Sequence, residues 1–486
     1  HMKARMLEIL VLEQLGFEVA EKVSEALAID PLDLAINRKA VELNGTPEDY
    51  VKVMRGELQN YLPVAHDNRQ YGFTEQALAV LSECPASSPL LGYYAAGGYL
   101  EQGENAEAKV AIAEGEAADS TYCFPSRLEE QVFLEKAIEL VPEASHAKYY
   151  LGNLLYDKKR YDEAIKLWEE AAQTWSEFPT VFRNLSFAYY NKRNDPKQAQ
   201  QMIDQAFSLD TTDARVLLEK TQLEAMTGVS VSDRLETLER YLKTTKDRDD
   251  LFIEYLTLLN VTGRHHEVLQ EIEGHIFHPW EGGEGKVSMQ YTYALTELGR
   301  QLIDTDPKKA EKTLKATFNY PHNLGEGKLP SNHDNVANLY LGRLYNNRGE
   351  KDKANVHFIE ATKGIQEPGS VLYYNDEPAD VLCYQGLAYQ ELGQQEQAAA
   401  KFDLLLEYGR THQKDTVEWD FFAVSAPAHS VYENDIQLDN EIYCIYLQGL
   451  GHLGKEEERA AKECFEKVLK LNPAHQGAIQ HLQLIK

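Results

Sequence analysis

Residues 341–361 read LGRLYNNRGEKDKANVHFIEA, and the spacing of their small and aromatic residues decides the fold. Gly342 stands 12 residues before Ala354 and 16 before Phe358. The same two spacings recur elsewhere, from Gly152 to Ala164 and Trp168 and from Gly386 to Ala398 and Phe402. A frame that recurs in this way indicates one supersecondary unit stacked many times.

Two short helices fit each copy of the frame. The glycine of the first helix lets a neighbouring helix approach closely, while Ala354, Phe358 and Ala361 lie on one face of the second. Gly349 and Gly393 stand where a first helix should stop, because glycine tolerates left-handed geometry. Prolines follow several second helices, where a helix must end, at Pro31, Pro142 and Pro473. Each hairpin leaves an apolar side uncovered, so we expect it to be stable only against its neighbours.

The frame resembles that of tetratricopeptide repeats over most of the 486 residues. It is clearest at 145–175, 333–362 and 379–408, and weaker copies lie at 89–117, 213–245, 248–272 and 441–473. Strand signals are scarce. The resemblance implies an all-α fold, a right-handed superhelix (α-solenoid) of roughly eleven helical hairpins.

The net charge of the chain limits the classes of ligand that it can bind. The net charge of −29 argues against a nucleic-acid backbone or an anionic membrane as the main partner. No apolar run approaches the roughly 18 residues of a spanning helix, and no secretory leader opens the chain. His1-Met2 looks like a cloning remnant, and Leu7 to Leu15 reads as a helix interior without a cap. We therefore expect an excised piece of a longer protein, a soluble chain with a cytoplasmic location favoured.

Five cysteines are scattered without metal-ligand spacing, at Cys84, Cys123, Cys383, Cys444 and Cys464. We expect small buried hydrophobic residues in a reduced state.

Repeat regularity divides the chain into three blocks. Irregular helical hairpins occupy 1–119, regular repeats occupy 120–277, and repeats with long connections occupy 278–486. The long connections carry prolines and aromatic residues, unlike solvated linkers. Because they recur between repeats, we expect them to cluster along one edge of the solenoid; they are 119–126, 274–286, 319–332, 364–378 and 410–437.

Two of these connections share the tetrapeptide Gly-Glu-Gly-Lys, at 283–286 and 325–328. Glycine-rich turns that enter a helix can present backbone N–H groups to an anion. A phosphate-binding Walker A loop is excluded, because Trp280 and His322 stand where it needs glycine. The alternative is structural: the glycines permit a tight turn, and each lysine pairs with a nearby acid.

No catalytic or metal-binding constellation stands out. His275, His278 and Glu281 have a loose spacing for metal ligands, and we expect neither a metal nor a cofactor. Carboxylates such as Asp376 and Asp420 arise by chance among 78 acidic residues. No serine or cysteine stands in a sequence motif typical of a catalytic nucleophile.

The connections also resemble those of a bacterial family of long proteins, which join an N-terminal β-rich region to a C-terminal tetratricopeptide array. The likeness is carried by 122–130, 183–185, 278–286, 323–328, 384–388 and 422–425. Residues 426–429 depart from the family pattern. The resemblance implies that any catalytic or carbohydrate-handling region lies outside this chain.

The leading hypothesis is a non-catalytic interaction scaffold, whose first helices line a concave groove and whose loops dock its own N-terminal region or a protein partner. One alternative is an accessory region of a carbohydrate-active enzyme, with Trp280 and Trp419 stacking on sugars. Another is a free-standing peptide-binding adaptor. The candidate binding residues are His278, Trp280, Glu281, Glu284, Lys286, Asn323, Glu326, Lys328, Asp376, Trp419 and Asp420.

Overall fold

A computed structural model gives the fold, and it describes residues 1–280, 282–330, 332–369, 377–418 and 430–485. Those residues form 27 α-helices and one 3₁₀ turn, with no strand, which confirms the expected all-α class. The chain divides into two compact units, His1–Ala188 and Tyr189–Lys486, each described here by itself. The three blocks defined by repeat regularity stay a prediction.

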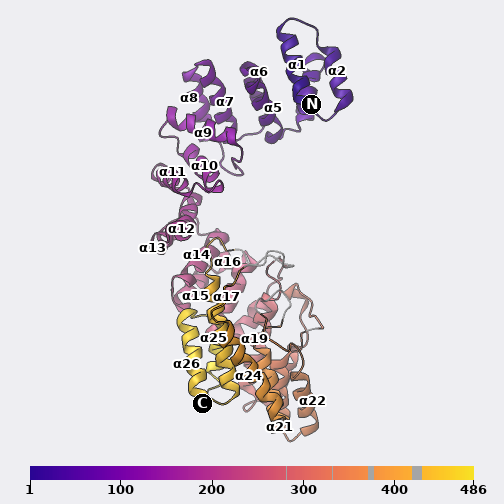
Figure 1. Cartoon of the computed structure of the whole chain (residues 1–486), viewed down its shortest axis with the longest axis vertical. Coiled ribbons are helices and arrows are strands. Elements are labelled where there is room, and N and C mark those ends of the chain that lie inside the picture. Colours follow the sequence, from indigo (N-terminus) through magenta and orange to yellow (C-terminus); the bar gives the residue numbers. More distant parts are fainter. Residues whose placement is uncertain (281, 331, 370–376, 419–429, 486) are drawn as a thin grey trace. The chain divides into compact units, whose positions relative to one another are not determined.

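The first unit holds eleven complete helices and most of a twelfth. They are α1 (Met2–Gln14), α2 (Ala20–Ile29), α3 (Leu34–Asn44), α4 (Pro47–Met54), α5 (Leu58–Gln70), α6 (Thr74–Ser82), α7 (Pro89–Gln102), α8 (Asn105–Ala117), α9 (Leu128–Leu140), α10 (Ser145–Asp157), α11 (Tyr161–Thr174) and α12 (Pro179–Arg193) (Figure 1).

The second unit begins at the end of α12. It holds α13 (Pro196–Leu209), α14 (Ala214–Met226), α15 (Val231–Arg240), α16 (Leu242–Lys246), α17 (Asp249–Val261), α18 (His265–Glu273), α19 (Lys286–Leu302), α20 (Pro307–Ala316), the 3₁₀ turn η1 (His322–Leu324), α21 (Asn335–Asn347), α22 (Lys351–Ala361), α23 (Val381–Glu391), α24 (Gln395–His412), α25 (Ile436–Gly454), α26 (Glu458–Leu471) and α27 (Gln476–Leu482).

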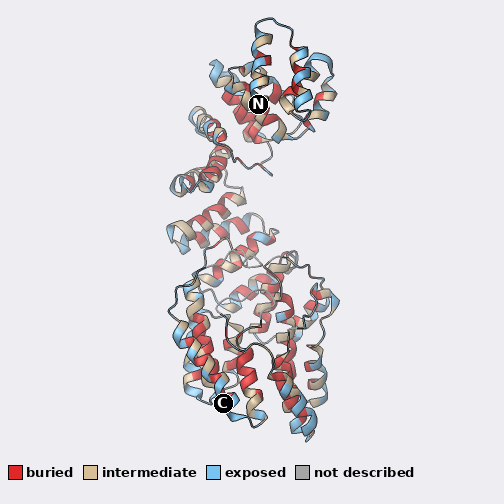
Figure 2. Cartoon of the chain, turned by 45° about the vertical axis from the view of Figure 1, so that its right-hand side comes forward, coloured by how far each residue is buried: buried red, intermediate tan, exposed pale blue. Residues whose placement is uncertain are grey.

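Successive helices pair as hairpins, as the repeat frame predicts. α7 packs on α8 and α10 on α11, while in the second unit α21 packs on α22, α23 on α24 and α25 on α26. Buried side chains lie where these helices face each other (Figure 2). The glycines after α7, α21 and α23 have positive φ, at 79° for Gly103 and 75° for both Gly349 and Gly393, so they end first helices in left-handed geometry.

The repeat spacing of 16 residues is a direct contact between the two helices of a hairpin. A Cβ built on Gly342 would lie 2.4 Å from the ring of Phe358, so the ring occupies the space that a side chain would need. The same holds for Gly152 under Trp168 and Gly386 under Phe402. Gly449 under Phe465 is a fourth copy of this contact, within the weaker repeat expected at 441–473.

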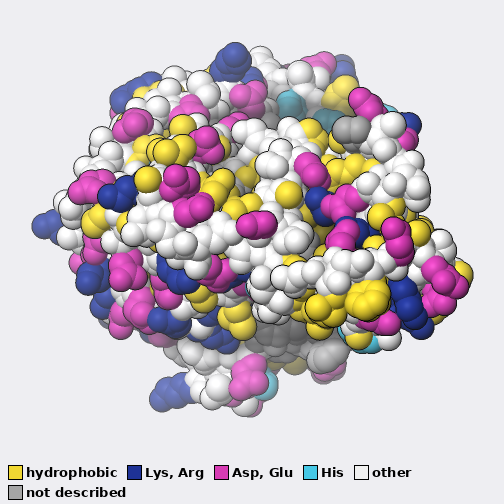
Figure 3. All heavy atoms as spheres, turned by 90° about the horizontal axis from the view of Figure 1, so that it is seen from above, with side chains coloured by type: hydrophobic (Ala, Val, Ile, Leu, Met, Phe, Trp, Pro, Cys, Tyr) yellow, Lys and Arg dark blue, Asp and Glu magenta, His cyan; other side chains and the backbone are white. Residues whose placement is uncertain are grey.

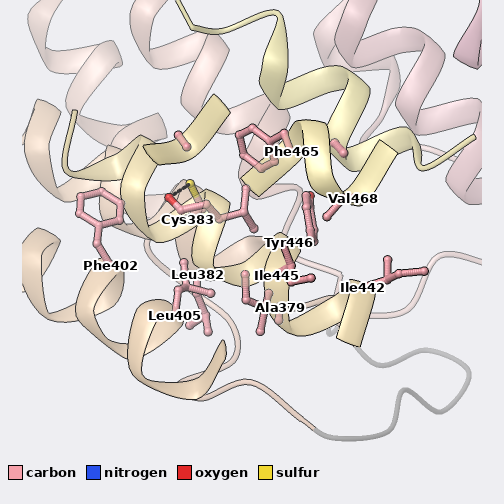
Figure 4. Close-up of a cluster of buried hydrophobic side chains, with 14 of the residues drawn as sticks. Ala379, Leu382, Cys383, Phe402, Leu405, Ile442, Ile445, Tyr446, Phe465 and Val468 are labelled. Carbon is pink, nitrogen blue, oxygen red and sulfur yellow. Dashed lines mark hydrogen bonds between the residues drawn. The ribbon is translucent and has the colours of Figure 1, made fainter. Parts of the chain in front are cut away.

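These rings belong to continuous cores. In the last repeats, Leu382, Phe402, Leu405, Ile445 and Phe465 come from four consecutive helices, α23 to α26, and form one buried cluster (Figure 4). Burial of such side chains supplies most of the stabilisation of a helical repeat, because isolated helices of this length are marginal in water.

The cysteines follow the expected pattern. All five are free thiols, and Cys123, Cys383 and Cys444 are buried. Burial raises the pKa of the Cys444 thiol to about 11 and that of Cys123 to about 12. These thiols therefore stay protonated at neutral pH and pack as small apolar groups.

The C-terminal segment closes the second unit. Helix α27 contacts α17, far back in the sequence, as well as its neighbours α25 and α26. Residues near the end of the long 410–437 connection return to the end of α12: Asn191 Nδ2 donates to the carbonyl of Val431 at 2.7 Å, and the Glu433 N–H donates to Asn191 Oδ1 at 2.9 Å.

We predict that far-UV circular dichroism of the chain shows a helix-dominated spectrum with the paired negative bands of an α-helix. Packed helical hairpins account for nearly all of its regular structure. A spectrum dominated by strand would contradict the repeat assignment.

We predict that Phe358→Ala lowers the free energy of unfolding by about 3–5 kcal/mol, because it removes a buried ring from the hairpin core. Gly342→Ala should cost about 1–3 kcal/mol, since the new methyl group collides with that ring. Urea denaturation of both variants is the measurement. Ile359→Ala is the control, because this neighbouring side chain is 51% exposed and should matter by less than about 0.5 kcal/mol.

Candidate functional site: the paired glycine loops

The two Gly-Glu-Gly-Lys segments lie against each other in the second unit. We call the described residues 274–280 and 282–285, together with 319–330, the loop pair. In the first loop, Gly285 has a φ of 77° and begins α19. The ring of Trp280 covers Gly283, where a Cβ would lie 2.0 Å from it, and the Gly283 N–H donates to the Trp280 carbonyl at 3.0 Å. The glycines therefore allow a turn that folds around the half-buried indole.

Asn323 fixes the second loop to the end of α18. Its Nδ2 donates to the carbonyls of Ile272 at 2.6 Å and His275 at 2.9 Å. The Phe277 N–H donates to the Asn323 carbonyl at 2.9 Å. Gly325, with a φ of 72°, sits so close to the Phe277 carbonyl that a Cβ would lie 2.5 Å from it. Asn323 is thus a structural clamp between the loops.

Glu326 joins the two tetrapeptides directly. Its carboxylate accepts from the Gly285 N–H at 3.1 and 3.0 Å and from Ser288 Oγ at 3.1 Å. Burial raises the pKa of Glu326, and these donors pull it back. The turn presents a backbone N–H to an anion, one of the two interpretations of the motif, but the anion is the chain's own carboxylate.

The lysines that end the two tetrapeptides, Lys286 and Lys328, differ in their contacts. Lys328 Nζ donates to the Thr317 carbonyl at 2.9 Å and pairs with Asp334, so it has the structural role weighed in the sequence. Lys286 has no ion pair within the described residues. The acids around it, Asp250 and Glu254, already pair with arginines. Burial lowers the pKa of Lys286 despite these acids.

The histidines of the first loop share one carboxylate, that of Asp249 at the start of α17. His275 Nε2 lies 2.7 Å from Asp249 Oδ1, and the His278 N–H donates to Oδ2 at 2.6 Å. The His278 side chain is otherwise 82% exposed. Glu284 accepts from the Gly282 N–H at 2.8 Å. Within the described residues no group of three potential ligands could hold a metal ion.

The structure therefore brings together six of the candidate residues near the loop pair: Trp280, Glu284, Lys286, Asn323, Glu326 and Lys328, with His278 at its edge. Glu281, Asp376, Trp419 and Asp420 lie outside the described residues. Whether the assembled residues bind anything stays a prediction.

One residue of the site was missed from the sequence. Asp249 organises the first loop, but in the sequence it reads as an ordinary acidic residue in the first turn of a helix, favoured there by the helix dipole. Its partners come 26 and 29 residues later, and no spacing rule connects them.

The inner side of α19 is covered by the last helix. Gln480 Nε2 of α27 donates to Glu297 Oε1 at 2.8 Å, and the amides of Gln476 and Gln290 bond to each other at 2.8 and 3.0 Å. The side of α19 that carries Gln290 and Glu297 is therefore covered by the chain's own C-terminal helix, and the groove expected along the first helices stays a prediction.

His481 of α27 is buried in this contact. Its Nδ1 lies 2.6 Å from the Gly477 carbonyl and 3.3 Å from the Tyr446 hydroxyl, while its Nε2 has no partner among the described residues. Burial holds the pKa of His481 down to about 4, below its ordinary 6.5. Glu297 opposes this shift, and His475 and Arg300 add to it.

No family model matches the chain. Among solved structures, the TPR domain of P58(IPK) is 12% identical, covers 96% of this chain and 95% of its own, and superposes with a TM-score of 0.25. The C-terminal part of a TPR repeat-containing protein from Cytophaga hutchinsonii is 14% identical, with 62% and 93% covered and a TM-score of 0.26. MamA from Desulfovibrio magneticus RS-1 is 15% identical, with 39% and 96% covered and a TM-score of 0.24.

The chain is an α-helical repeat protein, and its own packed hairpins with their glycine–aromatic contacts define that class of fold. Across the residues that the structure describes, no helix has the length and apolar character needed to cross a bilayer.

We predict that the free energy of unfolding of the second unit falls as pH drops from about 6.5 toward 4. The unfolded chain takes up a proton on His481 near its ordinary pKa of 6.5, whereas the folded chain resists until about 4. The stability that comes from neutral His481 is thus complete above pH 6.5 and lost below it. Urea midpoints measured between pH 7.5 and 4 provide the check.

His481→Gln should make that pH profile shallower, and the part due to His475, whose pKa burial also lowers to about 4, should remain. His278→Gln is the control, because it replaces an imidazole that is exposed to solvent. An unchanged slope in His481→Gln would show that the acid sensitivity has another source.

Proposed function

We propose that this chain is a non-catalytic protein-interaction scaffold and that the loop pair forms its docking surface. One observation carries the proposal: the first loop holds an apolar side chain, Ile276, out in water, with 67% of its surface exposed. An exposed apolar side chain on a loop whose backbone is held in place is available for burial against a partner.

The exposure of Ile276 is enforced by its two neighbours. His275 bonds to Asp249, and the rings of His275 and Phe277 both pack on Phe252, with centroid distances of 4.8 and 5.6 Å. Because both neighbours point inward, Ile276 points outward. Met289, one turn into α19, is also exposed, at 54%.

The loop pair is a preorganised surface. The backbone of the two loops is held by the Asn323 clamp, by the Glu326 contacts and by the Trp280–Gly283 packing. Little conformational entropy remains to be lost on binding, so modest apolar contacts can give useful affinity.

The resemblance to the bacterial family supports an intramolecular partner, the N-terminal region of a longer protein. A separate protein partner, with this chain as a free-standing adaptor, is the alternative. A saccharide site has less support, because Trp280 is engaged with Gly283 and Glu284 with Gly282. We therefore favour a protein surface as the ligand.

The test is binding of the region encoded upstream of this chain, produced separately, to the wild-type chain and to Ile276→Ser/Met289→Ser, measured by isothermal titration calorimetry. We expect the double variant to bind at least tenfold more weakly, since each lost side chain removes about 1 kcal/mol or more of apolar burial. Both positions are exposed, so the melting temperature should stay unchanged.

Val356→Ser is the matched control, because Val356 is equally exposed, at 59%, on α22. It should bind like the wild type. Binding of the upstream region that survives Ile276→Ser/Met289→Ser, or a panel of saccharides that binds in its place, would contradict the proposed docking surface.

A further inference from the structure

A second surface lies in the first unit, apart from the loop pair. It is a groove of about 560 Å³ that lies along α7 between α6 and α8. Its floor is a half-exposed stripe of α7, formed by Leu91, Ala95 and Tyr99 at intervals of four residues. With 1.5 Å of rise per residue, this stripe is about 12 Å long.

Small residues on α7 leave the space that forms the groove. A Cβ on Gly92 would lie 2.4 Å from the Ala111 carbonyl, so α8 sits directly on α7 at that point. A Cβ on Gly98 would lie 2.9 Å from Leu78, which brings α6 equally close at the other end. The floor between these contacts carries Ala95, whose methyl group is too short to fill the space.

The α8 side of the groove alternates acid and apolar groups. Glu107, Val110 and Glu114 all line it, and Val110 is 60% exposed. These glutamates are the charged groups among the described residues that line the groove, and neither has an ion-pair partner in the described part of the chain. The face of the molecule in Figure 3 likewise shows acidic side chains beside exposed hydrophobic ones.

We propose that this groove binds a short peptide segment in which apolar residues are flanked by lysine or arginine. The apolar residues would lie on Leu91, Ala95 and Tyr99, and the basic residues would pair with Glu107 and Glu114. The two glutamates of the groove complement a basic peptide at the site itself. The whole chain adds to this attraction, because its net charge of −29 attracts cationic partners.

The spacing of the two glutamates specifies the peptide. Seven residues of helix separate them, which is about 10.5 Å along α8. Basic residues that match this distance lie at i and i+7 in a helical peptide or at i and i+3 in an extended one. An anionic ligand such as a lipid headgroup or a nucleic acid would meet two unpaired carboxylates instead.

The test begins with a phage-displayed library of random 12-residue peptides, selected on the wild-type chain and, in parallel, on Glu107→Lys/Glu114→Lys. We expect wild-type selections to enrich Lys or Arg at one of the two spacings around apolar residues, and the charge-reversed chain to enrich Asp or Glu there. Acidic peptides from the wild type, or the same peptides from both chains, would overturn the proposal.

The strongest peptide is then labelled with fluorescein and titrated by anisotropy. Glu107→Lys/Glu114→Lys should weaken binding about tenfold at low salt, and Val110→Ser should weaken it at least threefold. A peptide with its basic residues replaced by glutamate should recover affinity for the charge-reversed chain.

Glu139→Lys/Glu143→Lys is the matched control, because it changes the net charge equally at exposed positions outside the groove. It should bind like the wild type, as should Ile276→Ser/Met289→Ser, which separates this groove from the loop pair. Equal losses in Glu139→Lys/Glu143→Lys and Glu107→Lys/Glu114→Lys would reduce the effect to net charge and overturn the groove as the site.

Discussion

The packing of an aromatic ring on a glycine of the preceding helix is the contact on which the repeats depend. Phe358 on Gly342 and Phe402 on Gly386 set how close the two helices of a hairpin come. A side chain on the glycine would push the helices apart, and a smaller residue in place of the ring would leave a cavity. Four hairpins each have their own copy of this contact, at Gly152, Gly342, Gly386 and Gly449, so the packing of each is set within the hairpin itself.

Because the packing within a hairpin is set by its own two helices, the connections between hairpins can differ in length and sequence. Between α18 and α19, and again between α20 and α21, the chain uses that freedom to form the loop pair. Its polar groups satisfy one another, with Glu326 on Gly285 and Asn323 on the end of α18. It leaves both apolar and polar side chains in solvent, with Ile276 67% exposed and the His278 side chain 82% exposed. Exposed side chains on a backbone that is held in place suit recognition of a partner.

The second unit also uses its own C-terminal helix as a structural element. Glutamines of α27 bond to Gln290 and Glu297 of α19, and His481 is buried behind them. Helix capping of a solenoid usually hides only the last repeat. Here the terminal helix contacts α19, whose Gln290 lies 186 residues before its partner Gln476. The same helix therefore both closes the unit and covers one side of α19.

The sequence by itself determined the all-helical class, the hairpin register and the burial of Trp168, Phe358 and Phe402, because these follow from contacts 16 residues apart that recur as a period. It also predicted that the two glycine loops lie together along one edge of the solenoid. Tertiary structure alone decided that Glu326 meets Gly285, that Asp249 holds two histidines and that Asn191 bonds to Val431 across 240 residues. Those contacts depend on how successive repeats stack, and each occurs once, so no periodic signal in the sequence encodes them.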